Sequence, residues 1–123
     1  MIKIFDLKEQ YKRFGKVIDK KVINILSSGN YILGENVVLF EDKVKKYLNG
    51  KYTLSCNSGT DALVLSMRAL GVQTGDEIIT TPFSYFATAE SISLVGAKPV
   101  FADINPHTFN INPKHIAKLI NKK

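Results

Sequence analysis

The stretch GDEIITTPFSYFATAESISLVGAKPVFADI, residues 75–104, contains two short apolar and β-branched runs with a helical segment between them. The runs EIITT (77–81) and KPVFADI (98–104) have the composition of buried strands, whereas residues 86–95 have that of a helix. A strand, a helix and a second strand at this spacing predict a crossover unit with parallel strands. The stretch therefore favours an α/β fold.

The same alternation continues on both sides of this stretch. Residues 52–56 are predicted to form an earlier strand and residues 60–70 the helix that follows it. Downstream, Asn112 and Pro113 resemble an N-cap and the first residue of a last helix, predicted over 113–121. The predicted order is β-α-β-α-β-α, and because it stops after a helix, the parallel sheet is expected to be incomplete.

Two amphipathic helices precede this α/β part. Apolar residues at helical spacing predict helices over 7–28 and 35–48, and Gly29 suits the left-handed position that follows a helix. We therefore divide the chain into an N-terminal helical segment, residues 1–50, and an α/β segment, residues 51–123.

Composition limits the functions to consider. The 123 residues suffice for one domain, and 45% hydrophobic with 23% charged residues is typical of a globular chain. The net charge of +6 comes mainly from scattered lysines without an arginine cluster, so no nucleic-acid partner is predicted. A single cysteine excludes an internal disulfide. No stretch reads as a signal peptide or a membrane span, which predicts a cytoplasmic protein without a membrane partner.

The sequence SGTD (58–61) stands where the first predicted strand passes into a helix. Ligands of open α/β sheets bind beyond the carboxyl ends of the strands, and the free N–H groups of a helix start attract anions. Gly59 would allow close approach, the Thr60 hydroxyl could bind a phosphate oxygen, and the Asp61 N–H could donate. The same residue types are also good N-caps, so the pattern alone leaves both interpretations open.

Three aromatic residues follow the second predicted strand, within TPFSYFATAE (81–90). Phe83, Tyr85 and Phe86 cannot all enter the core from one tight turn, so one ring could present its face to a flat ligand. Packing of all three against neighbouring helices is the alternative. A phosphate-binding turn and an aromatic ring at neighbouring strand ends favour a flat, phosphorylated cofactor.

The remaining reactive residues indicate little chemistry. His107 and His115 have no nearby cysteine or carboxylate cluster, so we predict surface histidines and no metal site. Cys56 is expected to be a small core residue at the end of a buried strand. Asp103 follows the third predicted strand, where it could face a site or cap the next turn.

The motifs SGTDAL (58–63), GDEIITTPFSYFATAE (75–90) and GAKPVFADI (96–104) resemble the DegT/DnrJ/EryC1/StrS family of sugar aminotransferases, pyridoxal-phosphate enzymes of the aspartate-aminotransferase fold. DLKEQY (6–11) and SGNYILGENVVLFE (28–41) are similar to the family's N-terminal segment, so the resemblance covers essentially the whole chain. Within the family, the motifs are similar to those of aminotransferases that act on UDP-2-acetamido-2-deoxy-3-keto-hexuronic acid for surface polysaccharides such as the O-antigen of lipopolysaccharide.

The resemblance implies the roles of five residues. Gly59, Thr60 and Asp61 would hold the phosphate of pyridoxal 5'-phosphate, Tyr85 would stack on its pyridine ring, and Tyr31 would lie on the substrate side. The substrates would be a keto nucleotide sugar and glutamate, and the enzyme a homo-oligomer. The family's cofactor-bonding lysine and its acidic partner of the pyridine nitrogen match nothing here. We therefore expect an N-terminal part of the enzyme, inactive alone, with no catalytic residue of its own.

Two alternatives remain open. One is a pyridoxal-phosphate-dependent sugar dehydratase of the same family, in which a histidine replaces the cofactor-bonding lysine. The other is a non-catalytic remnant that acts as a small binding or assembly module with weak cofactor affinity. An exposed sheet edge and uncovered apolar surface would favour association in either case.

Overall fold

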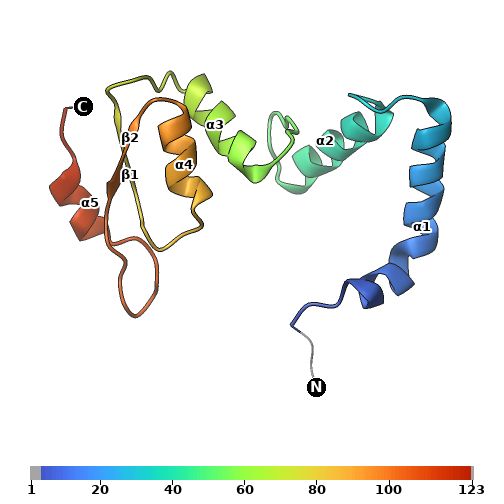
Figure 1. The fold of residues 1–123 in the computed structure, drawn as a ribbon, viewed down its shortest axis with the longest axis horizontal. Helices are drawn as coiled ribbons and strands as arrows, with labels where there is room; N and C mark the ends of the chain where they lie inside the picture. Colours follow the sequence, from blue (N-terminus) through green and yellow to red (C-terminus); the bar gives the residue numbers. More distant parts are fainter. Residues whose placement is uncertain (1–3, 123) are drawn as a thin grey trace. The chain divides into compact units, whose positions relative to one another are not determined.

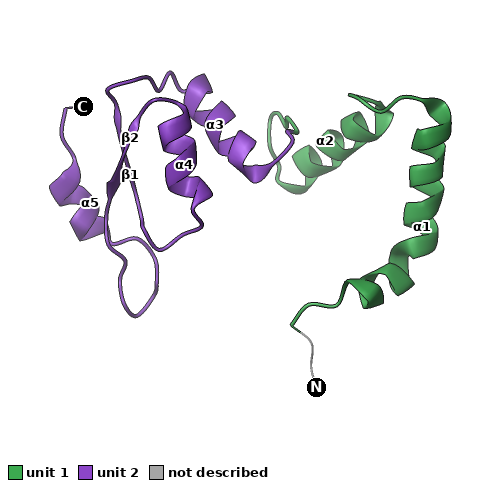
Figure 2. Ribbon diagram, in the orientation of Figure 1, with its two compact units in different colours: residues 1–55 green, residues 56–123 purple. Residues whose placement is uncertain are grey.

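The computed structural model describes residues 4–122, and the chain divides into two compact units, Met1–Ser55 and Cys56–Lys123 (Figure 2). Within the described residues, the first unit contains two helices, and the second contains three helices and two strands (Figure 1). The chain is thus α/β, with all of its described strands in the second unit.

Helix α1 covers Leu7–Ser28, as its apolar periodicity predicts. The Asp6 carboxylate caps its first turn by accepting a hydrogen bond from the Glu9 amide N–H at 3.1 Å. Gly29 follows with φ 72°, the left-handed conformation that ends many helices and that glycine adopts without strain. Both ends of α1 are therefore determined by local sequence.

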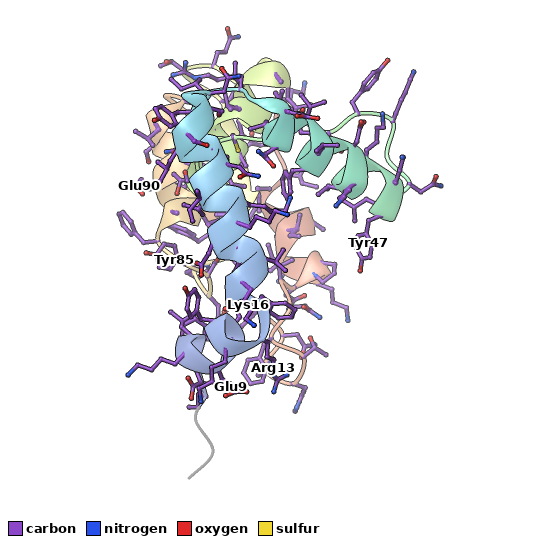
Figure 3. All side chains as sticks on the ribbon, turned by 90° about the vertical axis from the view of Figure 1, so that its right-hand side faces the viewer. Glu9, Arg13, Lys16, Tyr47, Tyr85 and Glu90 are labelled. Carbon is purple, nitrogen blue, oxygen red and sulfur yellow. The ribbon has the colours of Figure 1, made fainter. Side chains whose placement is uncertain are left out.

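Helix α2 covers Glu35–Tyr47, within the predicted 35–48. After the helix, the Gly50 N–H donates to the Lys45 carbonyl at 2.9 Å, which closes the last turn. Tyr47, at the end of α2, stands out from the helix in Figure 3 and is 88% exposed. The sequence therefore predicts this helix correctly to within one residue.

Residues 52–56 form no strand, so this prediction is wrong. A strand needs a neighbour that pairs its backbone groups, and none lies beside this segment within residues 4–122. Tyr52 and Leu54 are 82% and 83% exposed. Cys56 is also exposed, and not a core residue at a strand end. The observed order is α-α-α-β-α-β-α.

The second unit is organised around a two-stranded parallel sheet. Its two strands pair with Glu77 opposite Lys98 and Thr80 opposite Phe101, which confirms the predicted parallel pair. The elements of this unit are α3 (Gly59–Ala69), β1 (Glu77–Thr80), α4 (Ala87–Leu94), β2 (Lys98–Phe101) and α5 (Pro113–Leu119). Each lies within one or two residues of a predicted element, except that β2 ends at Phe101, before the predicted end at residue 104.

Helix α4 packs against β1, β2 and α3, and it supplies much of the core. The buried side chains are small or aliphatic: Ala87, Ser91, Ile92, Ala97 and Ala102. In Figure 1 the carboxyl ends of both strands and the first residues of α4 lie in the lower part of this unit. This is the edge at which α/β sheets bind ligands.

Much apolar surface of the described chain is exposed. The apolar stripe of α1, which repeats at helical spacing, is 44–58% exposed at Leu7, Tyr11, Phe14, Ile18 and Val22. Among residues 4–122 no helix is long and apolar enough to cross a membrane. The stripe is an apolar face of α1 that the described part of the first unit leaves exposed.

Candidate functional site

Ser58 determines how the chain enters α3. Its backbone is extended, with φ −152° and ψ 167°. Its Oγ accepts a hydrogen bond from the Asp61 amide N–H at 3.1 Å and lies 3.0 Å from Asp61 Oδ2, to which it donates. This exchange resembles a capping box with aspartate as the acidic partner. Because Ser58 engages both groups of Asp61, the Asp61 N–H is not free to donate to a ligand in this arrangement.

The next two backbone N–H groups are available. Within residues 4–122 the amides of Gly59 and Thr60 have no hydrogen-bond partner, as is usual in the first turn of a helix. A Cβ atom placed on Gly59 would meet nothing within 4 Å, so a ligand can approach the backbone there. The positive end of the α3 dipole and the Thr60 hydroxyl add to these donors, and together they can accept an anion such as phosphate.

Tyr85 lies in the loop between β1 and α4, two residues before α4 begins. Its side chain is 83% exposed, and its carbonyl accepts a hydrogen bond from the Thr88 N–H at 3.0 Å (Tyr85 is labelled in Figure 3). A hydrogen bond of 2.8 Å between the Ser84 and Thr88 hydroxyls holds the loop onto the start of α4. The Tyr85 ring is thus presented to solvent from an anchored backbone.

The neighbouring aromatic residues are also outside the core, whereas the sequence analysis considered one exposed ring or the packing of all three. Phe83 and Phe86 are 62% and 74% exposed, so these rings are not packed beneath the helices. Phe83 stacks on Phe109, with ring centroids 5.8 Å apart. Helices α3 and α4 pack against each other, so Gly59 and Thr60 at the start of α3 and Tyr85 just before α4 belong to the same packed part of the second unit.

Tyr31 belongs to the first unit, between α1 and α2. Its hydroxyl donates to the Leu26 carbonyl at 3.0 Å, although the side chain is 64% exposed. The ring is therefore turned back along the end of α1, and the hydroxyl serves one of the carbonyls that a helix end leaves unpaired.

Asp103 caps its own turn, the second of the two roles considered for it. Its Oδ1 accepts a hydrogen bond from the Ile104 N–H at 2.8 Å, and its own N–H donates to His115 Nδ1 at 2.9 Å. His115 is half-buried and links α5 to the end of β2, so the expectation of a surface histidine is wrong there. His107 is exposed, as expected. Over the described part of the chain, no group of His, Cys, Asp or Glu could hold a metal ion.

Sequence analysis missed Glu41. Its Oε1 accepts hydrogen bonds from both the N–H and the hydroxyl of Ser55, each at 2.7 Å. These bonds hold the pKa of the Glu41 carboxyl below its ordinary value, because they favour the ionised form. The sequence feature that could have indicated Glu41 is its place as an acidic residue at the border of the apolar face of α2, next to Val37, Phe40 and Val44.

The fold matches part of the fold of known aminotransferases. A DegT DnrJ EryC1 StrS aminotransferase from Brucella abortus superposes with a TM-score of 0.90 at 33% identity, covering 95% of this chain and 31% of that one. NtdA from Bacillus subtilis, solved with bound cofactor PMP, has a TM-score of 0.83 at 34% identity, covering 85% and 24%.

Residues 12–123 match the DegT/DnrJ/EryC1/StrS aminotransferase family, and the chain belongs to this family. A UDP-2-acetamido-2-deoxy-3-oxo-D-glucuronate aminotransferase from Pseudomonas aeruginosa is 47% identical over 114 residues, which are 93% of this chain and 32% of that protein. The chain thus spans about a third of the length of this curated relative.

The residues present fit the phosphate of a pyridoxal cofactor. A phosphate group accepts hydrogen bonds, and the start of α3 offers the unpaired N–H groups of Gly59 and Thr60, a hydroxyl and an open approach. The Asp61 carboxylate, the nearest negative charge in the sequence, is turned toward Ser58.

Proposed function

We propose that this chain provides the phosphate-binding turn and the ring-stacking residue of a pyridoxal-phosphate-dependent nucleotide-sugar aminotransferase. The reaction would move an amino group from glutamate to a keto sugar nucleotide, for surface polysaccharide synthesis. The observation that carries the proposal is the capped start of α3, with unpaired N–H groups at Gly59 and Thr60, in a chain of this family. When bound, pyridoxal phosphate would supply the electron-accepting ring on which amino transfer depends.

The turn would bind the phosphate through backbone and side chain together. The N–H groups of Gly59 and Thr60 and the Thr60 hydroxyl would donate to its oxygens, and the α3 dipole would favour its negative charge. Asp61 would contribute indirectly, since its N–H and carboxylate fix the Ser58 cap. Its proposed role is thus to shape the turn.

Tyr85 would lie against the pyridine ring. Its exposure leaves a face open for a flat ligand, and its anchored backbone reduces the entropy lost on binding. A ring stacked on Tyr85 and a phosphate on α3 would require both groups at one sheet edge, and this placement is part of the proposal.

The proposal assigns different roles to two parts of the chain. Residues 1–50 would form the helical segment, with Tyr31 on the substrate side, and residues 51–123 the first half of the cofactor-binding domain. We further propose a cytoplasmic homo-oligomer, because the exposed apolar stripe of α1 favours association. Light scattering that finds a monodisperse monomer at high concentration would contradict the oligomer.

Substitutions at the two contact residues test the site. We expect Thr60→Ala to weaken pyridoxal-phosphate binding about tenfold or more, as loss of a charged hydrogen bond does, and Thr60→Ser to retain it. Tyr85→Ala should weaken binding of pyridoxal phosphate and of pyridoxal alike. Tyr47→Ala is the matched control, because Tyr47 is as exposed as Tyr85 but lies at the end of α2. Unchanged affinity in both Thr60→Ala and Tyr85→Ala would refute the assignment.

A further inference from the structure

The loop between β1 and α4, residues 81–86, is shaped by local hydrogen bonds. The Phe83 N–H donates to the Thr81 hydroxyl at 3.1 Å, and the hydroxyls of Ser84 and Thr88 bond each other at 2.8 Å. Each of these bonds joins residues at most four positions apart. Local bonds of this kind shape a loop, but its position against other segments depends on contacts with residues farther along the chain.

A ring contact joins this loop to another loop of the second unit. The Phe83 ring stacks on the Phe109 ring, with centroids 5.8 Å apart and an angle of 24° between the planes. Aromatic pairs at such distances stabilise a structure beyond the area that they bury. Phe109 lies between β2 and α5, so the contact connects the loop that follows β1 with the loop that follows β2.

The backbone holds Phe109 in a conformation that phenylalanine rarely adopts. Its φ is 58°, in the left-handed region, where glycine and asparagine are more common. The Phe109 N–H donates to the Asn105 carbonyl, and the Asn105 N–H donates to the Asn110 carbonyl, each at 2.8 Å. A strained residue that its surroundings hold in place is a reason to look for a function. Here the strained position carries the ring that stacks on Phe83.

We propose that Phe109 is a positioning residue for Tyr85, acting through Phe83. This inference rests on the proposed function, since it assumes that Tyr85 stacks on the cofactor ring. Only Ser84 separates Phe83 from Tyr85, so their Cα atoms lie at most about 7 Å apart. The stack on Phe109 and the bond from Ser84 to Thr88 restrain the chain on both sides of this short connection. Tyr85 is thereby preorganised, which reduces the entropy lost when a ring binds.

The test compares two ligands that share a phosphate group, pyridoxamine 5'-phosphate and inorganic phosphate. Pyridoxamine 5'-phosphate carries the pyridine ring and has no aldehyde, so it does not react with the lysines of the chain. The ratio of the two dissociation constants measures what the ring contributes to binding. A general loss of folding weakens both ligands and leaves this ratio unchanged.

Substitutions at Phe109 separate the ring from the backbone. Phe109→Asn removes the ring but suits the left-handed backbone, whereas Phe109→Tyr keeps the ring. We expect Phe109→Asn to lower the ring contribution about three- to tenfold, the range of one aromatic pair, and Phe109→Tyr to retain it. In a Tyr85→Ala background Phe109→Asn should change nothing further, because the ring that it positions is gone. Phe5→Asn is the matched control, because Phe5 is an exposed phenylalanine outside the helices of the first unit.

The outcomes separate the two hypotheses. If the ring contributes nothing in the unsubstituted protein, or Tyr85→Ala leaves the ratio unchanged, the stacking part of the proposed function fails and the inference with it. If Tyr85→Ala lowers the ratio but Phe109→Asn does not, or Phe5→Asn lowers it as much, the inference alone is overturned. Equal losses in Phe109→Asn and Phe109→Tyr overturn it as well. Should Phe109→Asn not fold, Phe83→Ala removes the other ring of the stack, and an unchanged ratio there would overturn the inference.

Discussion

The two units of the chain are ordered by different means. In the first unit, Asp6 and Gly29 cap α1, whereas α2 starts at Gly34 without a side-chain cap. Gly15 is the buried residue of α1, and the Tyr11 ring of the same helix covers it, with the hydroxyl bound to Asp19 at 2.9 Å. In the second unit, α4 packs on the sheet and on α3 and buries Ala87 and Ile92. Packing between different helices and strands thus stabilises mainly the second unit.

This difference predicts where substitutions destabilise the protein. Helices with exposed apolar faces gain little stability from tertiary packing. A small core, in contrast, loses much stability when one of its few side chains is truncated. Shortening a side chain should therefore lower the free energy of unfolding strongly in the second unit and only slightly along α1.

The largest effect is expected at Ile92, which is 3% exposed on α4. Ile92→Ala should lower the free energy of unfolding by about 2–4 kcal/mol, because it leaves a cavity in the core of the second unit. Ile23→Ala is the control, since Ile23 on α1 is 61% exposed, and its cost should stay below about 0.5 kcal/mol. Urea unfolding measures both, and equal costs would remove the contrast between the units.

Gly96 is expected to show the next largest effect. It follows α4 with φ 86°, and a Cβ there would lie 2.5 Å from Thr74 Oγ1. Gly96→Ala should cost about 1–2 kcal/mol for the left-handed backbone and more for the clash. Gly71→Ala isolates the backbone term, because Gly71 has φ 80° but open space around it. Urea unfolding that gives equal costs for the two variants would exclude a steric contribution at Gly96.

The Ser58 cap should contribute less. Ser58→Ala removes the acceptor for the Asp61 N–H and should cost about 1 kcal/mol, with faster amide hydrogen exchange in the first turn of α3. Ser93→Ala serves as the comparison, because the Ser93 hydroxyl bonds only the Ala89 carbonyl within α4. Ser93→Ala should leave exchange in α3 unchanged, and a similar response to both variants would argue against the cap.

The contact between Glu41 and Ser55 should depend on pH. The pKa of Glu41 is lowered in the folded protein, so its stabilising effect is complete above the ordinary glutamate value of 4.5 and is lost as pH falls through the lower folded value. The chemical shift of the Ser55 amide should follow this titration, with a midpoint below 4.5. Glu41→Gln should abolish the titration at Ser55, and a midpoint at or above 4.5 would contradict the contact.

Local patterns were enough to predict the helices and the parallel strand pair. Asp6, Gly29 and Asn112 act on their own helix ends, and the apolar periodicity is visible in short windows. The strand at 52–56 could not be judged in this way, since an apolar run becomes a strand only beside a partner, and sequence does not reveal whether one is present.

The helix start at SGTD was predictable from the sequence, whereas anion binding there stays a prediction. The pairing of Asp61 with Ser58 could not be predicted, because it depends on side-chain rotamers. Glu41 lies 14 residues from Ser55, too far for a local pattern to connect them. The bond from the Tyr31 hydroxyl to Leu26 likewise depends on how the chain turns after α1.

The central claim is that the start of α3 binds the phosphate of a pyridoxal cofactor. Amide NMR of the protein, titrated in parallel with pyridoxal 5'-phosphate and with pyridoxal, tests it most directly. The account predicts downfield shifts of the Gly59 and Thr60 N–H signals with the phosphorylated ligand only, because these two donors are unpaired without it. Equal responses to both ligands at these amides, or none, would contradict it.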